Sequence, residues 1–166
     1  MKIAFLSILL AAAPLAVLAD SPDASFYKHA AEGGISEVEA GNLASTKGNS
    51  QAVKDFGAMM VKDHSAANDK LKSIASGKGV DLPTSASMSQ MATKAKLDVL
   101  SGETFDKSYI KSQVKAHRET IALFKKEAAT GQDADAKAFA TSTLPTLRTH
   151  MKEITKIAAD AGVSTK

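Results

Sequence analysis

Three of the four histidines in this chain occupy positions from which a helix would direct them into its apolar face. At roughly 100° per residue, His64 lies at the centre of such a face, and His117 and His150 lie within the faces of two later segments. In the first long segment Glu37 lies on the apolar face, whereas Glu39 projects to the opposite side. The apolar residues of the four faces are Phe26, Ala30, Val38, Gly41 and Ala44; Val53, Phe56, Met60, Ala67, Leu71 and Ile74; Tyr109, Ile110, Val114, Ile121, Phe124 and Ala128; and Phe139, Leu147, Met151, Ile154, Ile157 and Ala158. Each segment therefore directs one potential metal ligand inward.

Three imidazoles and one carboxylate form a ligand set that suits a first-row transition metal. Neutral imidazole nitrogen binds zinc, copper, iron and manganese, whereas calcium and magnesium prefer shells of oxygen ligands. A carboxylate beside neutral histidines offsets part of the charge of the ion. The pattern therefore predicts that Glu37, His64, His117 and His150 bind one transition-metal ion, either Fe, Mn, Zn or Cu.

A metal-free arrangement is the alternative interpretation of these residues. The inward histidines and Glu37 can form a buried hydrogen-bond network with Asn68, Tyr109 and Gln113 that satisfies the polar groups without an ion. The sequence leaves both interpretations open. The fourth histidine, His29, leans away from the apolar face of its segment, which predicts a surface residue.

Helical sequence features extend over nearly the whole chain after residue 20. Ala, Lys, Glu, Leu and Met dominate, valine and isoleucine recur at helical spacing, and the alternating β-branched runs of a sheet are missing. Ser50 is placed to cap the second helix, and Gly131 and Gly162 are placed to end the last two. The expected long helices cover about residues 23–46, 51–77, 104–130 and 133–160, with a short helix near residues 89–100. We expect an all-α fold whose long helices form a four-helix bundle.

The connections between these helices indicate a topology. Tight turns near residues 48 and 132 predict two antiparallel hairpins. The second and third long helices are separated by about 25 residues, enough to cross the bundle from end to end and to include the short helix. A long central crossover is typical of ferritin-like bundles, and an up-and-down bundle with a side excursion is the alternative.

The heights of the four inward residues along the helices agree. At a rise of 1.5 Å per residue, Glu37 and His64 should lie about 15 and 21 Å from the first turn. His117 and His150 should lie about 20 and 24 Å from the second turn. Because the helices are about 40 Å long, all four side chains are expected near the middle of the bundle, at one level.

Composition argues against several classes of protein. The chain contains no cysteine, so it has no disulfide and no lipid anchor on an N-terminal cysteine. Its 21 Lys plus Arg residues are interspersed with 18 Asp plus Glu residues, and it lacks tryptophan, so nucleic-acid binding is not expected. After residue 19 no apolar run approaches the roughly 20 residues of a membrane helix, so no transmembrane segment is expected in the mature protein.

Four segments of the chain resemble a family of exported bacterial proteins. The segments are EVEAGNLA (37–44), AVKDFGAMMVKDHSAANDKL (52–71), FDKSYIKSQVKAHRETIALFKKEAATGQD (105–133) and FATSTLPTLRTHMKEI (139–154). That family is catalogued as a domain of unknown function, is often labelled an outer membrane protein and has a ferritin-like four-helix fold. The resemblance covers nearly all of the mature chain. It implies that Glu37, His64, His117 and His150 occupy recurrent polar positions in the family's core.

The di-iron signature of the ferritins is missing from the chain. That signature needs a Glu-x-x-His motif on two helices, but Val61, Val114 and Leu147 stand three positions before the three inward histidines. A single-metal centre is therefore expected rather than a ferroxidase site of the ferritin kind.

Three classes of function fit these observations. The first is an exported protein that binds one transition-metal ion, in metal handling or in oxidative or envelope stress. The second is a metal-free helical stress or interaction module with a buried His and Glu network. The third is a metal-dependent enzyme that removes superoxide or peroxide at an open coordination position.

Residues 1–19 have the features of a secretory signal peptide. Lys2 precedes a short Ala-rich apolar run, and small residues lie before Asp20. We expect export to remove residues 1–19 and to leave a domain of residues 20–166 in the periplasm or the medium. Mass spectrometry of the exported protein should give a mass that begins at Asp20, and an intact Met1 would contradict this prediction.

Overall fold

The computed structural model describes residues 22–165, and these residues form helices and connecting loops without a strand. The all-α prediction is therefore confirmed. The helices are α1 (Pro22–Lys47), α2 (Gln51–Gly77), α3 (Met88–Asp98), α4 (Gly102–Thr130) and α5 (Ala134–Asp160). The predicted signal peptide and the junction before Asp20 lie outside the described residues.

Local capping interactions fix where the helices begin. The Ser50 side chain accepts a hydrogen bond from the backbone N–H of Val53, as predicted for the start of α2. Ser87 and Gln90 form a capping box at the start of α3. After α5, Gly162 adopts a φ of 63°, a conformation that side chains disfavour and that ends the helix.

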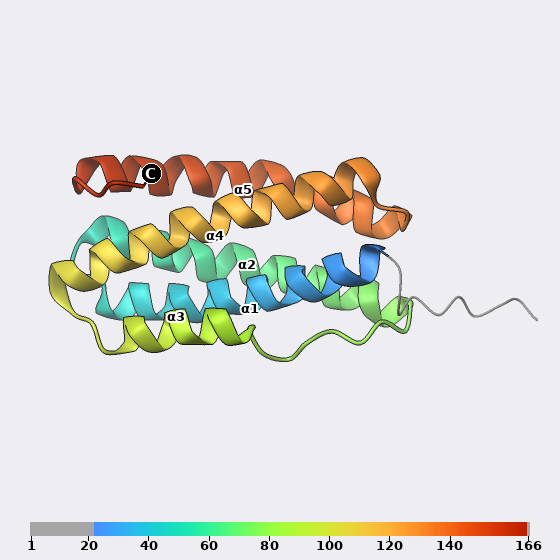
Figure 1. Ribbon diagram of the computed structural model, residues 1–166, viewed down its shortest axis with the longest axis horizontal. Coiled ribbons are helices and arrows are strands. Elements are labelled where there is room, and N and C mark those ends of the chain that lie inside the picture. Colours follow the sequence, from blue (N-terminus) through green and yellow to red (C-terminus); the bar gives the residue numbers. More distant parts are fainter. Residues whose placement is uncertain (1–21, 166) are drawn as a thin grey trace, which may run out of the picture.

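The long helices are arranged as two antiparallel pairs, α1 with α2 and α4 with α5 (Figure 1). The chain after α2 runs along the length of the molecule before it reaches α4 at the opposite end (Figure 1). The short helix α3 belongs to this crossover and packs against α1 and α4. The crossover thus carries the chain from end to end, which places the start of α4 beside the turn between α1 and α2.

Two buried aspartates fix the register of one helix pair against the other. Asp106 of α4 accepts hydrogen bonds from the backbone N–H groups of Asn49 and Ser50, both at 2.8 Å, in the turn between α1 and α2. At the other end, Asp23 of α1 accepts hydrogen bonds from the N–H groups of Gln132 and Asp133, at 3.0 and 3.1 Å. Each helix pair therefore contributes an aspartate that binds the turn of the other helix pair.

Within the first pair, the helices approach until their backbones touch. A Cβ atom built on Gly57 of α2 would lie 2.7 Å from the carbonyl oxygen of Gly41 in α1, and one on Gly41 would lie 2.7 Å from the Gly57 carbonyl. Any side chain at either position would push α1 and α2 apart. This close approach keeps the middle of α1 near the middle of α2.

The apolar core is divided into two halves. One half includes Phe56 and Met60 of α2 with Tyr109 of α4, and the other half includes Phe26 of α1 with Phe124 of α4. In each long helix the inward polar residue predicted from the sequence lies between the residues of the two halves. A polar layer therefore separates two apolar regions. Among the described helices, none combines the length and apolar character that a membrane span requires.

We expect Asp106→Ala to destabilise the protein by about 2–3 kcal/mol. Hydrogen bonds to a charged group contribute roughly 1.5–3 kcal/mol each, and the partly exposed N–H groups recover some of this from water. Urea unfolding followed by circular dichroism measures the change in the free energy of unfolding. Asp69→Ala, at an exposed aspartate of α2, is the control and should change it little. Equal stabilities of the two variants would contradict the proposed role of Asp106 in holding the turn between α1 and α2.

Candidate metal centre

Three histidines from three helices meet in the polar layer. His64 of α2, His117 of α4 and His150 of α5 each offer one ring nitrogen, and these nitrogen atoms lie within 4.8 Å of one another. The ring centroids of His117 and His150 are 5.4 Å apart, and the His64 ring lies 5.9 Å from the first and 5.4 Å from the second. All three side chains are buried. We call His64, His117 and His150 the histidine triad.

Hydrogen bonds at the outer sides of two rings determine where their protons lie. His117 Nδ1 lies 3.0 Å from the backbone oxygen of Gln113, one turn earlier in α4. His150 Nε2 lies 3.0 Å from a carboxylate oxygen of Asp63 in α2. Because these oxygens accept hydrogen bonds, the two ring nitrogens must donate. In the neutral rings, His117 Nε2 and His150 Nδ1 are therefore unprotonated.

These two nitrogens face each other. His117 Nε2 and His150 Nδ1 are 3.4 Å apart inside the core. Two lone pairs at this distance repel each other, so the contact is favourable when a proton or a metal ion lies between the rings. A histidine that binds a metal commonly donates its other N–H to a backbone carbonyl or a carboxylate. Both rings have such a partner.

His64 completes the triad as a neutral ring. Burial, together with the nearby rings of His117 and His150, lowers the pKa of His64 to about 3. Its Nε2 atom is buried and has no hydrogen-bond partner among residues 22–165. At neutral pH the ring therefore carries a lone pair that is available to a metal ion.

Burial also favours the neutral form of His150. It lowers the pKa of His150, an effect that the hydrogen bond to Asp63 opposes and the nearby His117 ring adds to. Phe56 packs edge-on against both His117 and His150, with ring centroids 6.1 and 6.4 Å away. The side of the triad that faces Phe56 is therefore apolar.

Glu37 lies beside the triad and outside the group of converging nitrogens. Its Oε1 atom is 3.8 Å from His117 Nδ1, the nitrogen that points away from His150. Its Oε2 atom is buried without a hydrogen-bond partner in the described chain, as are the side-chain oxygens of Gln113 and Tyr109. The structure thus brings three of the four predicted ligands together and places the fourth next to His117.

Asp63 is a functional candidate that the helical pattern does not predict. It precedes His64 in α2, yet its partner is His150 of α5. The only sequence signal is an acidic residue about 100° around the helix from an inward histidine, and such residues are common on exposed faces. His29 is exposed, as the pattern predicts.

A comparison with protein families identifies the family of the chain. The chain belongs to the DUF4142 family. The family is described as a domain of unknown function, and its sequence profile matches residues 10–157. This confirms the resemblance to a family of unknown function. No curated protein sequence matches this DUF4142 chain.

Two crystal structures share the fold of this DUF4142 chain. A "putative secreted protein DUF305" from Streptomyces coelicolor matches with a TM-score of 0.75 and 15% identity, over 89% of this chain and 98% of the other. A DUF305 fragment from Deinococcus radiodurans matches with a TM-score of 0.73 and 10% identity, over 83% of this chain and 95% of the other. At these identities the likeness concerns the fold.

The low pKa of His64 predicts a loss of stability in mild acid. An unfolded histidine has a pKa near 6.5, whereas folded His64 has a pKa of about 3. Between these values the unfolded chain binds a proton that the folded chain does not. The free energy of unfolding should therefore fall as the pH decreases below about 6.5, by at most about 1.4 kcal/mol per pH unit from this residue.

Urea unfolding of the metal-free protein between pH 7.5 and 5 measures this slope. Burial raises the pKa of Glu127 to about 7, which contributes a slope of the opposite sign. The difference between the native protein and His64→Gln isolates the histidine, because glutamine does not titrate. Identical slopes for the two proteins would contradict the assignment.

Proposed function

We propose that the protein is exported and binds one transition-metal ion through His64, His117 and His150, in metal handling. The observation that carries this proposal is the pair of ring nitrogens, His117 Nε2 and His150 Nδ1, that face each other 3.4 Å apart. Their opposite nitrogens are already engaged by the Gln113 carbonyl and the Asp63 carboxylate. A cation between the rings turns a repulsive contact into two coordinate bonds.

The spacing of the nitrogens supports this assignment. In a tetrahedral site with zinc–nitrogen bonds of about 2.0–2.1 Å, neighbouring ligand nitrogens lie about 3.3–3.4 Å apart. The separation of His117 Nε2 and His150 Nδ1 is 3.4 Å. His64 reaches the same ion after a small side-chain rotation, since its ligand atom lies within 4.8 Å of the other two.

We assign the fourth position of the ligand set to Glu37. Its carboxylate lies near His117 and lines the same small cavity as His64. Together with Asp63, Glu37 places two carboxylates around three imidazoles. This charge balances a divalent ion, whose burial would otherwise be costly.

The unpartnered polar atoms favour the metal over the metal-free network. A satisfied network would use the inward polar groups of His64, Glu37, Gln113 and Tyr109 as partners of one another. Each of these side chains has instead a buried atom without a hydrogen-bond partner among the described residues. Leaving such atoms unsatisfied costs roughly 1–3 kcal/mol each, and a bound ion removes this cost for the atoms that it coordinates.

The architecture and the location belong to the same proposal. Two antiparallel pairs joined by a long crossover are the arrangement of a ferritin-like four-helix bundle, and α3 is then an addition to the crossover. The predicted signal peptide directs residues 20–166 to the periplasm or the medium, in line with the description of the Streptomyces coelicolor neighbour.

One observation also favours a redox function at this site. A cavity of about 20 Å³ lies beside His64, which is room for a single water-sized molecule. A metal with an open position toward this cavity would meet a small substrate such as superoxide or peroxide. Removal of either substrate by the metal-loaded protein, with loss in His64→Ala, would add this activity to metal binding.

Metal titration tests the proposed site. We expect calorimetric titration of metal-free protein with Zn²⁺, Cu²⁺, Mn²⁺ and Fe²⁺ to show one ion per chain for at least one metal, and His64→Ala to remove most of the binding. The bound ion should stabilise the fold by roughly 2.7 kcal/mol when its free concentration is a hundred times Kd. Elemental analysis of protein from its own host identifies the ion.

Asp69→Ala is the control, because Asp69 is exposed and lies outside both the triad and the cavity beside His64. This variant should bind metal as the native protein does. A melting temperature that none of the four metals changes would contradict the proposal and favour the metal-free interaction module.

A further inference from the structure

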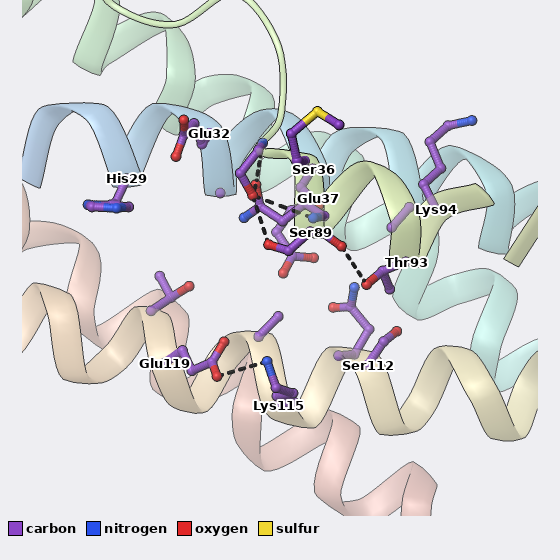
Figure 2. Close-up of a pocket in the computed structure, with 18 of the residues that line it drawn as sticks. His29, Glu32, Ser36, Glu37, Ser89, Thr93, Lys94, Ser112, Lys115 and Glu119 are labelled. Atoms are coloured by element: carbon purple, nitrogen blue, oxygen red, sulfur yellow. Dashed lines mark hydrogen bonds and ion pairs between the residues drawn. The ribbon is translucent and has the colours of Figure 1, made fainter. Parts of the chain in front are cut away.

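A groove with a volume of about 710 Å³ lies between α1, α3 and α4. Figure 2 shows Glu37 at its centre, reaching from α1 into the space that faces α4, with charged and hydroxyl side chains around it. Two lysines of the rim are already paired, Lys115 with Glu119 at 2.9 Å and Lys94 with Asp98 at 2.9 Å. Their charges are thereby partly neutralised toward an approaching cation.

The floor of the groove offers two oxygen atoms without partners. Glu37 is 5% exposed and Gln113 is 3% exposed, and both line the groove. Glu37 Oε2 and Gln113 Oε1 are buried and accept no hydrogen bond from the residues that the structure describes. Unpartnered carboxylate and amide oxygens in the lining of one groove favour a cation.

The groove and the histidine triad are linked through a second, smaller space. The cavity of about 20 Å³ touches His64 and shares four lining residues with the groove, which are His29, Gly33, Glu37 and Thr120. Glu37 also approaches His117, with Oε1 at 3.8 Å from Nδ1. The same carboxylate therefore borders the open groove, the inner cavity and the triad.

No packing contact explains why residue 33, which lines this passage, is a glycine. A Cβ atom at Gly33 would meet only Gln90 Nε2, at 3.9 Å. The next residue is different, since a Cβ atom at Gly34 would collide with the Asn68 side chain. An alanine at Gly33 would favour the helix by roughly 0.8–1.0 kcal/mol. A glycine at this position, which lines both the groove and the inner cavity, leaves the space toward α3 open.

We propose that the groove is the route by which the metal ion reaches the triad, with Glu37 and Gln113 as the position where the ion first binds. This inference rests on the proposed metal site. The ion exchanges bound water for the two oxygens at the floor, passes Gly33 and Thr120, and is taken up by the histidines while Glu37 remains beside it. The ligand of the groove is thus a divalent transition-metal cation in transit.

Blocking the passage tests the route without changing the ligands. Gly33→Leu places a branched side chain at the shared wall, and Gly77→Leu does so at an exposed helical glycine with no neighbour within 4 Å. We use the metal alone, choosing the one that binds the native protein most tightly. Stopped-flow mixing with a competing chromophoric chelator gives the association and dissociation rates, and calorimetry gives Kd.

We expect Gly33→Leu to slow association and dissociation equally, by roughly tenfold or more, which corresponds to a barrier increase of about 1.4 kcal/mol. Its Kd should match that of the native protein, because the ligands are intact. Gly77→Leu should leave both rates unchanged. Thr120→Leu narrows the same passage from α4 and repeats the test if Gly33→Leu fails to fold.

A separate pair of variants tests the charge of Glu37 at the floor of the groove. Glu37→Gln keeps the shape of the side chain and removes its charge, so association should slow, and Kd should also rise because Glu37 is the proposed fourth ligand. Glu39→Gln on the same helix should change neither quantity. Native rates in Gly33→Leu and Thr120→Leu, with one ion still bound per chain, would overturn the route and leave the metal site intact. An absence of metal binding by the native protein would instead overturn the proposed function.

Discussion

Two buried carboxylates hold the helix pairs in register, and the polar layer depends on that register. Asp106 binds the turn between α1 and α2, and Asp23 binds the turn between α4 and α5. Each carboxylate satisfies two backbone N–H groups that a tight turn would otherwise leave unpaired. A slip of one helical turn would displace the pairs by about 5.4 Å. His64 would then lose its level with His117 and His150.

The polar layer has a cost that the two apolar halves of the core offset. Burial lowers the pKa of His64 and of His150, so the folded chain keeps both rings neutral at neutral pH. A neutral buried ring with an unprotonated nitrogen is poorly suited to a purely structural role, because the nitrogen has given up water and gained no donor. The same ring is well suited to a metal ion, for which it needs no deprotonation.

The three rings of the triad have different surroundings, and the two nearby carboxylates have different roles. A backbone carbonyl orients His117, and the Asp63 carboxylate orients His150. The Asp63 side chain is 31% exposed, so it links the centre to the surface at α2 and α5. Glu37 borders the groove on the opposite side, between α1 and α4. Asp63 is thus hydrogen-bonded to a proposed metal ligand, whereas Glu37 faces the proposed route of the ion.

Helical periodicity was sufficient to predict the long helices and the inward direction of the four polar residues. Hydrophobic spacing determines which face of a helix is buried, and caps such as Ser50 and Asp133 determine where a helix begins. Rise per residue then placed Glu37 and the three histidines at one level, because hairpins with short turns leave little freedom in height. These features are local, so the sequence alone determines them.

The tertiary structure decided which atoms meet. The pairing of Asp63 with His150, and the facing nitrogens of His117 and His150, depend on how α2, α4 and α5 are rotated against one another. A helix rotation of a few tens of degrees moves a side-chain atom by several ångströms, and periodicity specifies a face only to about that precision. The position of Glu37 beside His117, outside the triad, depends on the same packing. Long-range contacts, such as the hydrogen bonds of Asp23 and Asp106 to the turns of the opposite helix pairs, set that packing. No local pattern in the sequence encodes them.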